Sequence, residues 1–204
     1  MVQAVLLALI AGFADTVGYL RYEAFAGLMT GNTILLGIEV ASRKFTGATY
    51  HAAIIVAFLA GVVLAQGLLR MNVPVWAALC ISALLLVLCG PLDHLAASLV
   101  LPLAMGLQNS AANRFNGVAL NTVFITGNIQ KVGEGLMAWI WRLRDPAAPA
   151  PAGFAIYALV WVAYAFGAGL GAVAERALAQ PLLLPAVVLP FVMLPWQRIG
   201  ARPS

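Results

Sequence analysis

The stretch Met29-Thr30-Gly31-Asn32-Thr33 places a polar, glycine-containing triplet inside a long apolar segment. The same triplet returns 96 positions later, in Ile125-Thr126-Gly127-Asn128-Ile129. Each copy follows a helix end that carries polar residues, starting at Asp15 in the first half and at Gln108 in the second. Corresponding breaks in the membrane segments of two similar halves are typical of transporters, where an interrupted helix lines the binding site.

The composition is that of a membrane protein. Of the 204 residues, 63% are hydrophobic and 9% are charged, and the mean hydropathy is +0.98. Soluble domains carry about 25% charged residues, so a chain this apolar is expected to be integral to a bilayer. The 11 basic residues, which leave a net charge of +4, are scattered singly or in pairs between apolar runs. That pattern fits membrane-flanking anchors and argues against nucleic acid as a partner.

No disulfide, metal or cofactor site is expected. Cys80 and Cys89 stand nine residues apart in one apolar run, and nine residues of helix span about 13 Å, which is too far for a disulfide. No cluster of histidine and cysteine has the spacing of a metal site. The sequence also lacks a nucleotide-binding loop, a nucleophile elbow and a paired-carboxylate site. We therefore expect no cofactor and no enzymatic activity.

The chain is interpreted as a single membrane domain, residues 1–204, with two tandem repeats over about 2–90 and 91–197. The triplets align, and Val56-Ala57-Phe58-Leu59-Ala60-Gly61 matches Val162-Ala163-Tyr164-Ala165-Phe166-Gly167. We expect an all-α integral membrane protein with about four apolar segments in each repeat and six to eight transmembrane helices. Eight crossings with cytoplasmic termini are favoured, because they place six basic residues inside and four outside. If one segment of each half is re-entrant, three cross and the repeats are inverted.

Ten residues are candidates to line a solute site between the repeats. They are Asp15, Thr30, Gly31, Asn32, Gln108, Asn109, Thr126, Gly127, Asn128 and Glu134. Glycine lets a helix break so that freed backbone groups meet a ligand, and asparagine supplies both a donor and an acceptor. The competing interpretation is helix packing through small and polar residues. We expect the two triplets to face each other near the bilayer centre and to act as one site.

Two of the charged candidates have a structural interpretation beside the functional one. Asp15 is either a helix-end residue that reaches interfacial water and pairs with Arg21, or a carboxylate that binds a coupling proton or a substrate. Glu134 follows Lys131 by three residues. It is either the ion-pair partner of that lysine within the helix or part of a polar stripe along a cavity.

Small residues recur at four-residue steps in two corresponding segments, Ala57/Gly61/Ala65 and Ala163/Gly167/Gly171. Such steps let helix backbones approach closely. They predict packing seams, either inside one subunit or between subunits. A homo-oligomer is therefore one of the two alternatives.

The stretch Ala11-Gly12-Phe13-Ala14-Asp15-Thr16-Val17-Gly18-Tyr19-Leu20, followed by the first triplet, resembles the YoaK-like family of small bacterial membrane proteins of unknown function. Ala104-Met105-Gly106-Leu107-Gln108-Asn109 and the second triplet are similar to the second-half motifs of that family. The resemblance covers roughly residues 4–175. It implies a multi-pass protein of the bacterial inner membrane, and it supplies no substrate and no assigned ligand residues.

The expected function is transport or permeation of a small polar solute, with the site at the interface of the repeats. The alternative is a scaffold or partner-binding subunit without a solute path. A water-accessible cavity containing Asp15 and both triplets would favour transport, whereas a dry polar seam would favour the structural role. The expected partners are the lipid bilayer and the solute.

Overall fold

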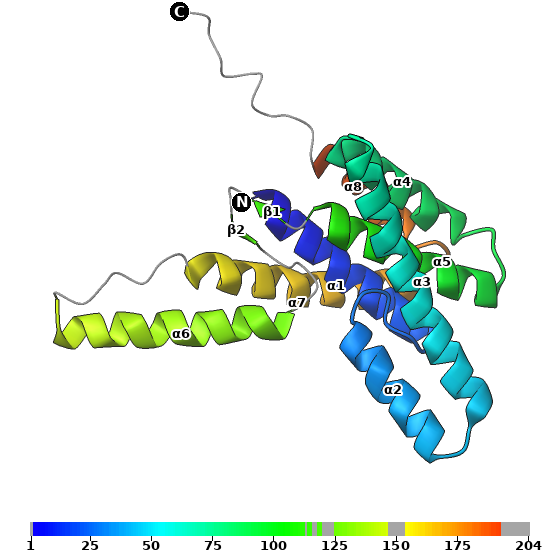
Figure 1. Ribbon diagram of the computed structural model, residues 1–204, viewed down its shortest axis with the longest axis horizontal. Helices are drawn as coiled ribbons and strands as arrows, with labels where there is room; N and C mark the ends of the chain where they lie inside the picture. The colour runs from blue at the N-terminus through cyan, green and yellow to red at the C-terminus, as the bar shows by residue number, and fades with distance from the viewer. Residues whose placement is uncertain (1, 113, 116–117, 120–124, 147–153, 193–204) are drawn as a thin grey trace, which may run out of the picture.

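The computed structural model describes residues 2–112, 114–115, 118–119, 125–146 and 154–192. Helices make up most of this part of the chain, which agrees with the predicted fold class (Figure 1). The helices of the first half are α1 (Val2–Tyr22), α2 (Met29–Ala41), α3 (Phe45–Arg70) and α4 (Val75–Leu88). Those of the second half are α5 (His94–Ala111), α6 (Ile125–Arg144), α7 (Phe154–Ala177) and α8 (Leu183–Val192). Between α5 and α6, the two-residue strands β1 (Arg114–Phe115) and β2 (Val118–Ala119) pair antiparallel.

Helix length separates the segments that can cross a bilayer from those that cannot. Among the described residues, α1, α3 and α7 are both long and apolar enough to cross, with 21, 26 and 24 residues. The helices α4 and α8 are apolar but have only 14 and 10 residues. The 13 residues of α2 extend about 20 Å, which is less than the roughly 30 Å of a hydrocarbon core. The expected second crossing is therefore not present as a full-length helix.

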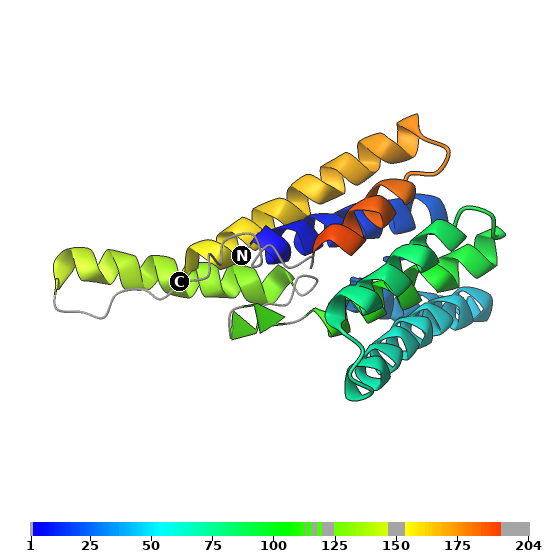
Figure 2. The ribbon, with the colours of Figure 1, turned by 90° about the horizontal axis from the view of Figure 1, so that it is seen from above.

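The first helix of each half packs along the third helix of the other half (Figure 2). A Cβ atom on Gly12 of α1 would overlap the carbonyl oxygen of Tyr164 on α7, and one on Gly106 of α5 would overlap that of Phe58 on α3. These approaches are so close that only glycine fits. The glycines with such contacts in the two seams are Gly12, Gly61, Gly106 and Gly167. The predicted small-residue seams are confirmed as contacts within one chain.

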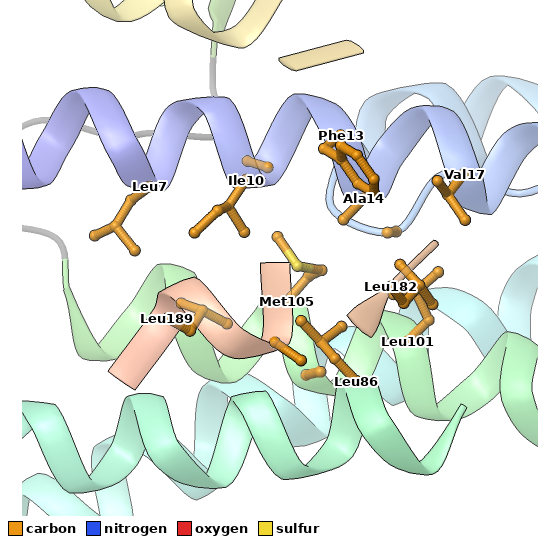
Figure 3. Close-up of a cluster of buried hydrophobic side chains, with 14 of the residues drawn as sticks. Leu7, Ile10, Phe13, Ala14, Val17, Leu86, Leu101, Met105, Leu182 and Leu189 are labelled. Carbon is orange, nitrogen blue, oxygen red and sulfur yellow. The ribbon is translucent and has the colours of Figure 1, made fainter. Parts of the chain in front are cut away.

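The helices α1 and α5 run in opposite directions. Near the start of α1, the Gln108 side chain donates to the carbonyl oxygen of Leu7 at 3.3 Å. Near its end, the His94 ring lies 3.1 Å from the carbonyl oxygen of Arg21. Apolar side chains fill the space between α1, α4, α5 and α8, as Figure 3 shows for Leu7, Ile10, Val17, Leu86, Leu101, Met105 and Leu189. This core holds the two halves together around the antiparallel pair.

Candidate functional site

The chain turns back along α1 before α2 begins. A Cβ atom on Gly18 would lie 2.8 Å from the carbonyl oxygen of Ala24, so the connecting loop runs against the last turns of α1. The amides of Gly27 and Leu28 then donate to Oδ1 of Asp15 at 2.6 and 3.0 Å. Since Asp15 stands seven residues before the end of α1, α2 starts about 10 Å inside that end. The helix α2 therefore begins beside the interior of α1 rather than beyond its end.

The helix α3 begins at the end of the molecule where α1 finishes. The Tyr50 hydroxyl, in the second turn of α3, donates to the carbonyl oxygen of Tyr22 at 2.8 Å. The loop and α2 therefore connect the end of α1 to the start of α3, as the ribbon in Figure 1 shows. The favoured eight crossings required this segment to cross, and α2 alone, with 13 residues, is too short for a full crossing.

Asp15 joins three elements at one carboxylate. Its relative exposure is 3%, and Oδ2 accepts a hydrogen bond of 2.6 Å from the Tyr164 hydroxyl on α7. With the two amides before α2, three donors surround the carboxylate. The predicted pairing with Arg21 is wrong, because Arg21 donates instead to Oε1 of Glu175 at 2.8 Å.

The carboxylate of Asp15 takes the place of a capping residue in α2. The residue at the N-cap position, Leu28, has no side-chain oxygen and makes no capping hydrogen bond. The first amides of a helix lack partners within it and carry a partial positive charge. A carboxylate from α1 both satisfies these amides and complements that charge, so Asp15 holds the N-terminus of α2 in the protein interior.

The first triplet closes the loop onto α2. Asn32 is fully buried, its Oδ1 accepts from the Phe25 amide at 2.9 Å, and its Nδ2 donates to the Phe25 carbonyl at 2.8 Å. A Cβ atom on Gly31 would lie 2.7 Å from the Phe25 ring, which stacks on Tyr19. Thr30 is exposed. Asn32 and Gly31 therefore fix the loop before α2 against the start of this helix, while Thr30 faces outward.

Two adjacent residues of α5 carry buried side-chain oxygens that have no hydrogen-bond partner in the described part of the chain. They are Oε1 of Gln108, which is fully buried, and Oδ1 of Asn109, which is 9% exposed. Buried polar atoms are nearly always paired. Two adjacent residues with open acceptors thus make this stretch of α5 a candidate to receive hydrogen-bond donors.

The remaining candidates lie on α6. Asn128 is buried, whereas Thr126, Gly127 and Glu134 are exposed. Glu134 accepts from Lys131 at 2.7 Å, so the ion pair within the helix is confirmed. Because that pair is half exposed, it has little effect on stability.

The two triplets lie on helices with different neighbours, because α2 packs against α3 and α6 packs against α7. The side-chain amide of Asn32 bonds the backbone of Phe25. A site shared by the two triplets stays a prediction. The structure adds Tyr164, whose only sequence signal was its alignment with Phe58, an apolar residue in the matching segment.

Asn32→Ala is expected to lower stability, because it leaves the partly buried amide and carbonyl of Phe25 without their partners, at a cost of up to about 1–3 kcal/mol each. The measurement is the midpoint of thermal unfolding in detergent. Thr30→Ala, in the same triplet but exposed, is the matched control and should leave the midpoint unchanged. Combined with Asn128→Ala, the losses should add, because both polar groups of the Asn32 side chain already bond Phe25. A strongly non-additive double variant would support the shared site.

Two cavities in the described residues lie apart from these groups. One, of about 390 Å³, is an apolar groove between α1, α7 and α8. The other, of about 780 Å³, lies where α1 ends and α3 and α5 begin, and is lined in part by Arg21, Glu23, Tyr50 and His94. Neither is lined by Asp15 or by a triplet residue. The Asp15 carboxylate therefore sits in a closed polar seam.

Comparison with known proteins identifies relatives. The family profile described as "Protein of unknown function (DUF1275)" matches residues 3–194. The chain is 25% identical over 191 residues to the UPF0700 transmembrane protein YoaK of Bacillus subtilis (strain 168), an alignment that covers 83% of this chain and 81% of the relative. No solved structure matches it. The resemblance seen in the sequence is thus confirmed, and the chain is a membrane protein.

Proposed function

We propose that this chain, which belongs to the DUF1275 family of proteins of unknown function, moves a small polar solute across the bacterial inner membrane. The observation that carries the proposal is the buried Asp15 carboxylate at the N-terminus of a re-entrant half-helix. An ionisable group inside a membrane costs about 2.5–3.5 kcal/mol on insertion scales and typically marks a substrate or ion path. Half-helices whose N-termini point inward are a recurrent way to build a binding site in transporters.

The proposed architecture consists of two inverted repeats, each with three crossings and one half-helix. Three contacts support it: α1 on α7 matches α5 on α3, α2 on α3 matches α6 on α7, and α4 meets α8. Equivalent helices α1 and α5 run in opposite directions, as an inverted pair requires. The small residues in the seams, Gly12 with Gly106 and Gly61 with Gly167, are related in the same way.

The basic residues suggest the orientation of these six crossings. Seven belong to the side where α1 starts or to segments that adjoin it in sequence, and four belong to the other side. The first group is Arg70, Arg114, Lys131, Arg142, Arg144, Arg198 and Arg202, and the second is Arg21, Arg43, Lys44 and Arg176. By the positive-inside rule, the N-terminus is cytoplasmic.

Single cysteines at Ser42 and Asn72 will test the crossing number, in a chain whose Cys80 and Cys89 are replaced by alanine. Both positions are exposed. With six crossings, Ser42→Cys reacts with an impermeant maleimide in intact cells, and Asn72→Cys reacts only after permeabilisation. Eight crossings from the same cytoplasmic N-terminus predict the reverse pattern, so the two arrangements cannot give the same result.

The solute path is proposed to pass between Asp15 with Tyr164 on one side and Gln108 with Asn109 on the other. The carboxylate and the two open amide oxygens accept hydrogen bonds, so the solute class is a small polar molecule that carries N–H or O–H donors. The side chains of Thr126, Gly127 and Glu134 are exposed on α6 and lie outside this proposed path. The proposal assigns no catalytic step to any residue.

The test is solute flux into liposomes that contain the purified chain, followed by light scattering after an osmotic step. Urea, glycerol and glycine serve as probes, and protein-free liposomes and a chain with Gln108→Leu and Asn109→Leu serve as controls. We expect at least one probe to enter about tenfold faster with the native chain. Equal rates for all probes in all liposomes would contradict the proposal.

A scaffold or partner-binding subunit is the second candidate. It is favoured by the closed seam, since neither of the two cavities described above reaches Asp15. In that case Asp15 only fastens α2 to α1 and α7, and no probe will pass.

A further inference from the structure

The two halves differ at the position where they should be most alike. Asp15 stands three residues after the seam glycine Gly12, and Asn109 stands three residues after the equivalent Gly106. Opposite them, Tyr164 precedes Gly167 by three residues on α7. Its equivalent on α3 is Phe58. A carboxylate with a hydroxyl donor in one half is thus an amide with a phenyl ring in the other.

The comparison of Asp15 with Asn109 separates the requirements of helix packing from the chemistry that only a carboxylate provides. An asparagine has nearly the shape of an aspartate, and its Oδ1 can accept the same backbone amides. The second half carries the amide at the equivalent position, so the close packing of the seam does not require a carboxylate there. An ionisable group at the buried position is nevertheless unfavourable in a membrane. What Asp15 has and Asn109 lacks is the ability to bind a proton.

We propose that Asp15 is a reversible proton-binding site, and that the proton it takes up accompanies the solute. This inference rests on the proposed function for the coupling and on the geometry alone for the proton site. The ligand is a proton from water, which bonds to one carboxylate oxygen and leaves a neutral carboxylic acid.

Proton uptake changes the hydrogen bonds of the carboxylate oxygen that receives the proton. The ionised carboxylate accepts from Gly27, Leu28 and Tyr164. A proton on Oδ2 makes that atom a donor, so the Tyr164 oxygen becomes an acceptor and its own hydrogen turns elsewhere. A proton on Oδ1 displaces one of the two amides. Either way, the link between α1, the start of α2 and α7 is altered by a single proton.

Among the described residues, Tyr164 is the one titratable side chain that makes a hydrogen bond to Asp15. The loop before α2 contributes only backbone amides. The nearest ion pair along α1 and α7 is Arg21 with Glu175, six residues beyond Asp15 on α1. On α5, the titratable residue near α1 is His94, which lies by Arg21. A change in the protonation of Asp15 therefore acts mainly on its hydrogen bonds with the Tyr164 hydroxyl and with the amides at the start of α2.

Infrared difference spectroscopy on the full chain in lipid nanodiscs tests the proton site without a substrate. On acidification we expect a carboxylic-acid carbonyl band that is absent in Asp15→Asn. Exposed carboxyls such as Glu134 contribute equally to both spectra. Asn109→Asp should add a second band from the equivalent position. Tyr164→Phe keeps the Asp15 carboxyl and places at position 164 the phenyl ring found at the equivalent Phe58, so the band should remain in this variant. An unchanged band in Asp15→Asn overturns the proposal.

Coupling is tested in liposomes that contain a pH-sensitive dye, with gradients of urea, glycerol or glycine. We expect the probe that enters to change the internal pH, and Asp15→Asn to reduce this proton flux at least tenfold. Solute entry without a pH change overturns the coupling and leaves the proposed function standing. A titrating Asp15 band without any solute entry supports the proton site and contradicts the proposed function instead.

Discussion

Gly106→Ala is expected to be the most damaging conservative substitution in this chain. The added Cβ would overlap the carbonyl oxygen of Phe58, a backbone atom that cannot move unless α3 and α5 separate. Overpacking costs about 1–3 kcal/mol where side chains can yield, and a contact with backbone places this variant at or above the upper limit. We expect loss of a monodisperse peak in detergent, or a thermal midpoint lowered by about 5 °C or more.

Gly67→Ala on α3 is the matched control, because a Cβ atom there meets nothing within 4 Å. Replacing glycine by alanine inside a helix improves its propensity by up to about 1 kcal/mol, so the control should be neutral or slightly stabilising. Gly12→Ala, at the equivalent seam of α1 and α7, should behave like Gly106→Ala. A stable, monodisperse Gly106→Ala protein would show that the close α3–α5 contact does not exist.

Asp15→Ala is expected to have the second large effect, on the start of α2. It removes the acceptor of the Gly27 and Leu28 amides and of the Tyr164 hydroxyl. A buried donor left without a partner costs about 1–3 kcal/mol, and three are affected here. We expect a thermal midpoint lowered by about 5 °C or more and faster hydrogen exchange at residues 25–32, measured by mass spectrometry.

Asp15→Asn is the matched variant for this experiment, because its Oδ1 still accepts from the amides. It should retain most of the thermal stability and protection of residues 25–32 even where proton uptake is lost. Equal damage from the alanine and asparagine variants would mean that the negative charge, rather than an acceptor oxygen, holds α2.

The class of the protein and its outline were predictable from residue types alone. A bilayer has no water for polar groups, so a chain with 9% charged residues and long apolar runs must be a membrane protein. The small-residue steps around Gly61 and Gly167 predicted close helix contacts, because absence of side chains at four-residue intervals is what lets backbones meet. The pairing of Lys131 with Glu134 followed from helix geometry in the same way.

The site depended on contacts between distant parts of the chain. Asp15 finds its donors 12, 13 and 149 positions away, and no local pattern states which of these it will meet. Its neighbour Arg21 was nearer in sequence, yet it pairs with Glu175 on α7. The choice was made by the packing of α1 on α7, which brings the hydroxyl of Tyr164 to the carboxylate.

The apolar composition, read without coordinates, was sufficient for a helical membrane protein, since it is a property of residue type. The position of α2, the packing of first and third helices across the two halves and the burial of Asp15 emerged only in three dimensions. The physical reason is that a 13-residue apolar helix satisfies its internal backbone hydrogen bonds wherever it is placed. The Asp15 carboxylate, which accepts from the Gly27 and Leu28 amides, fixes where this helix begins.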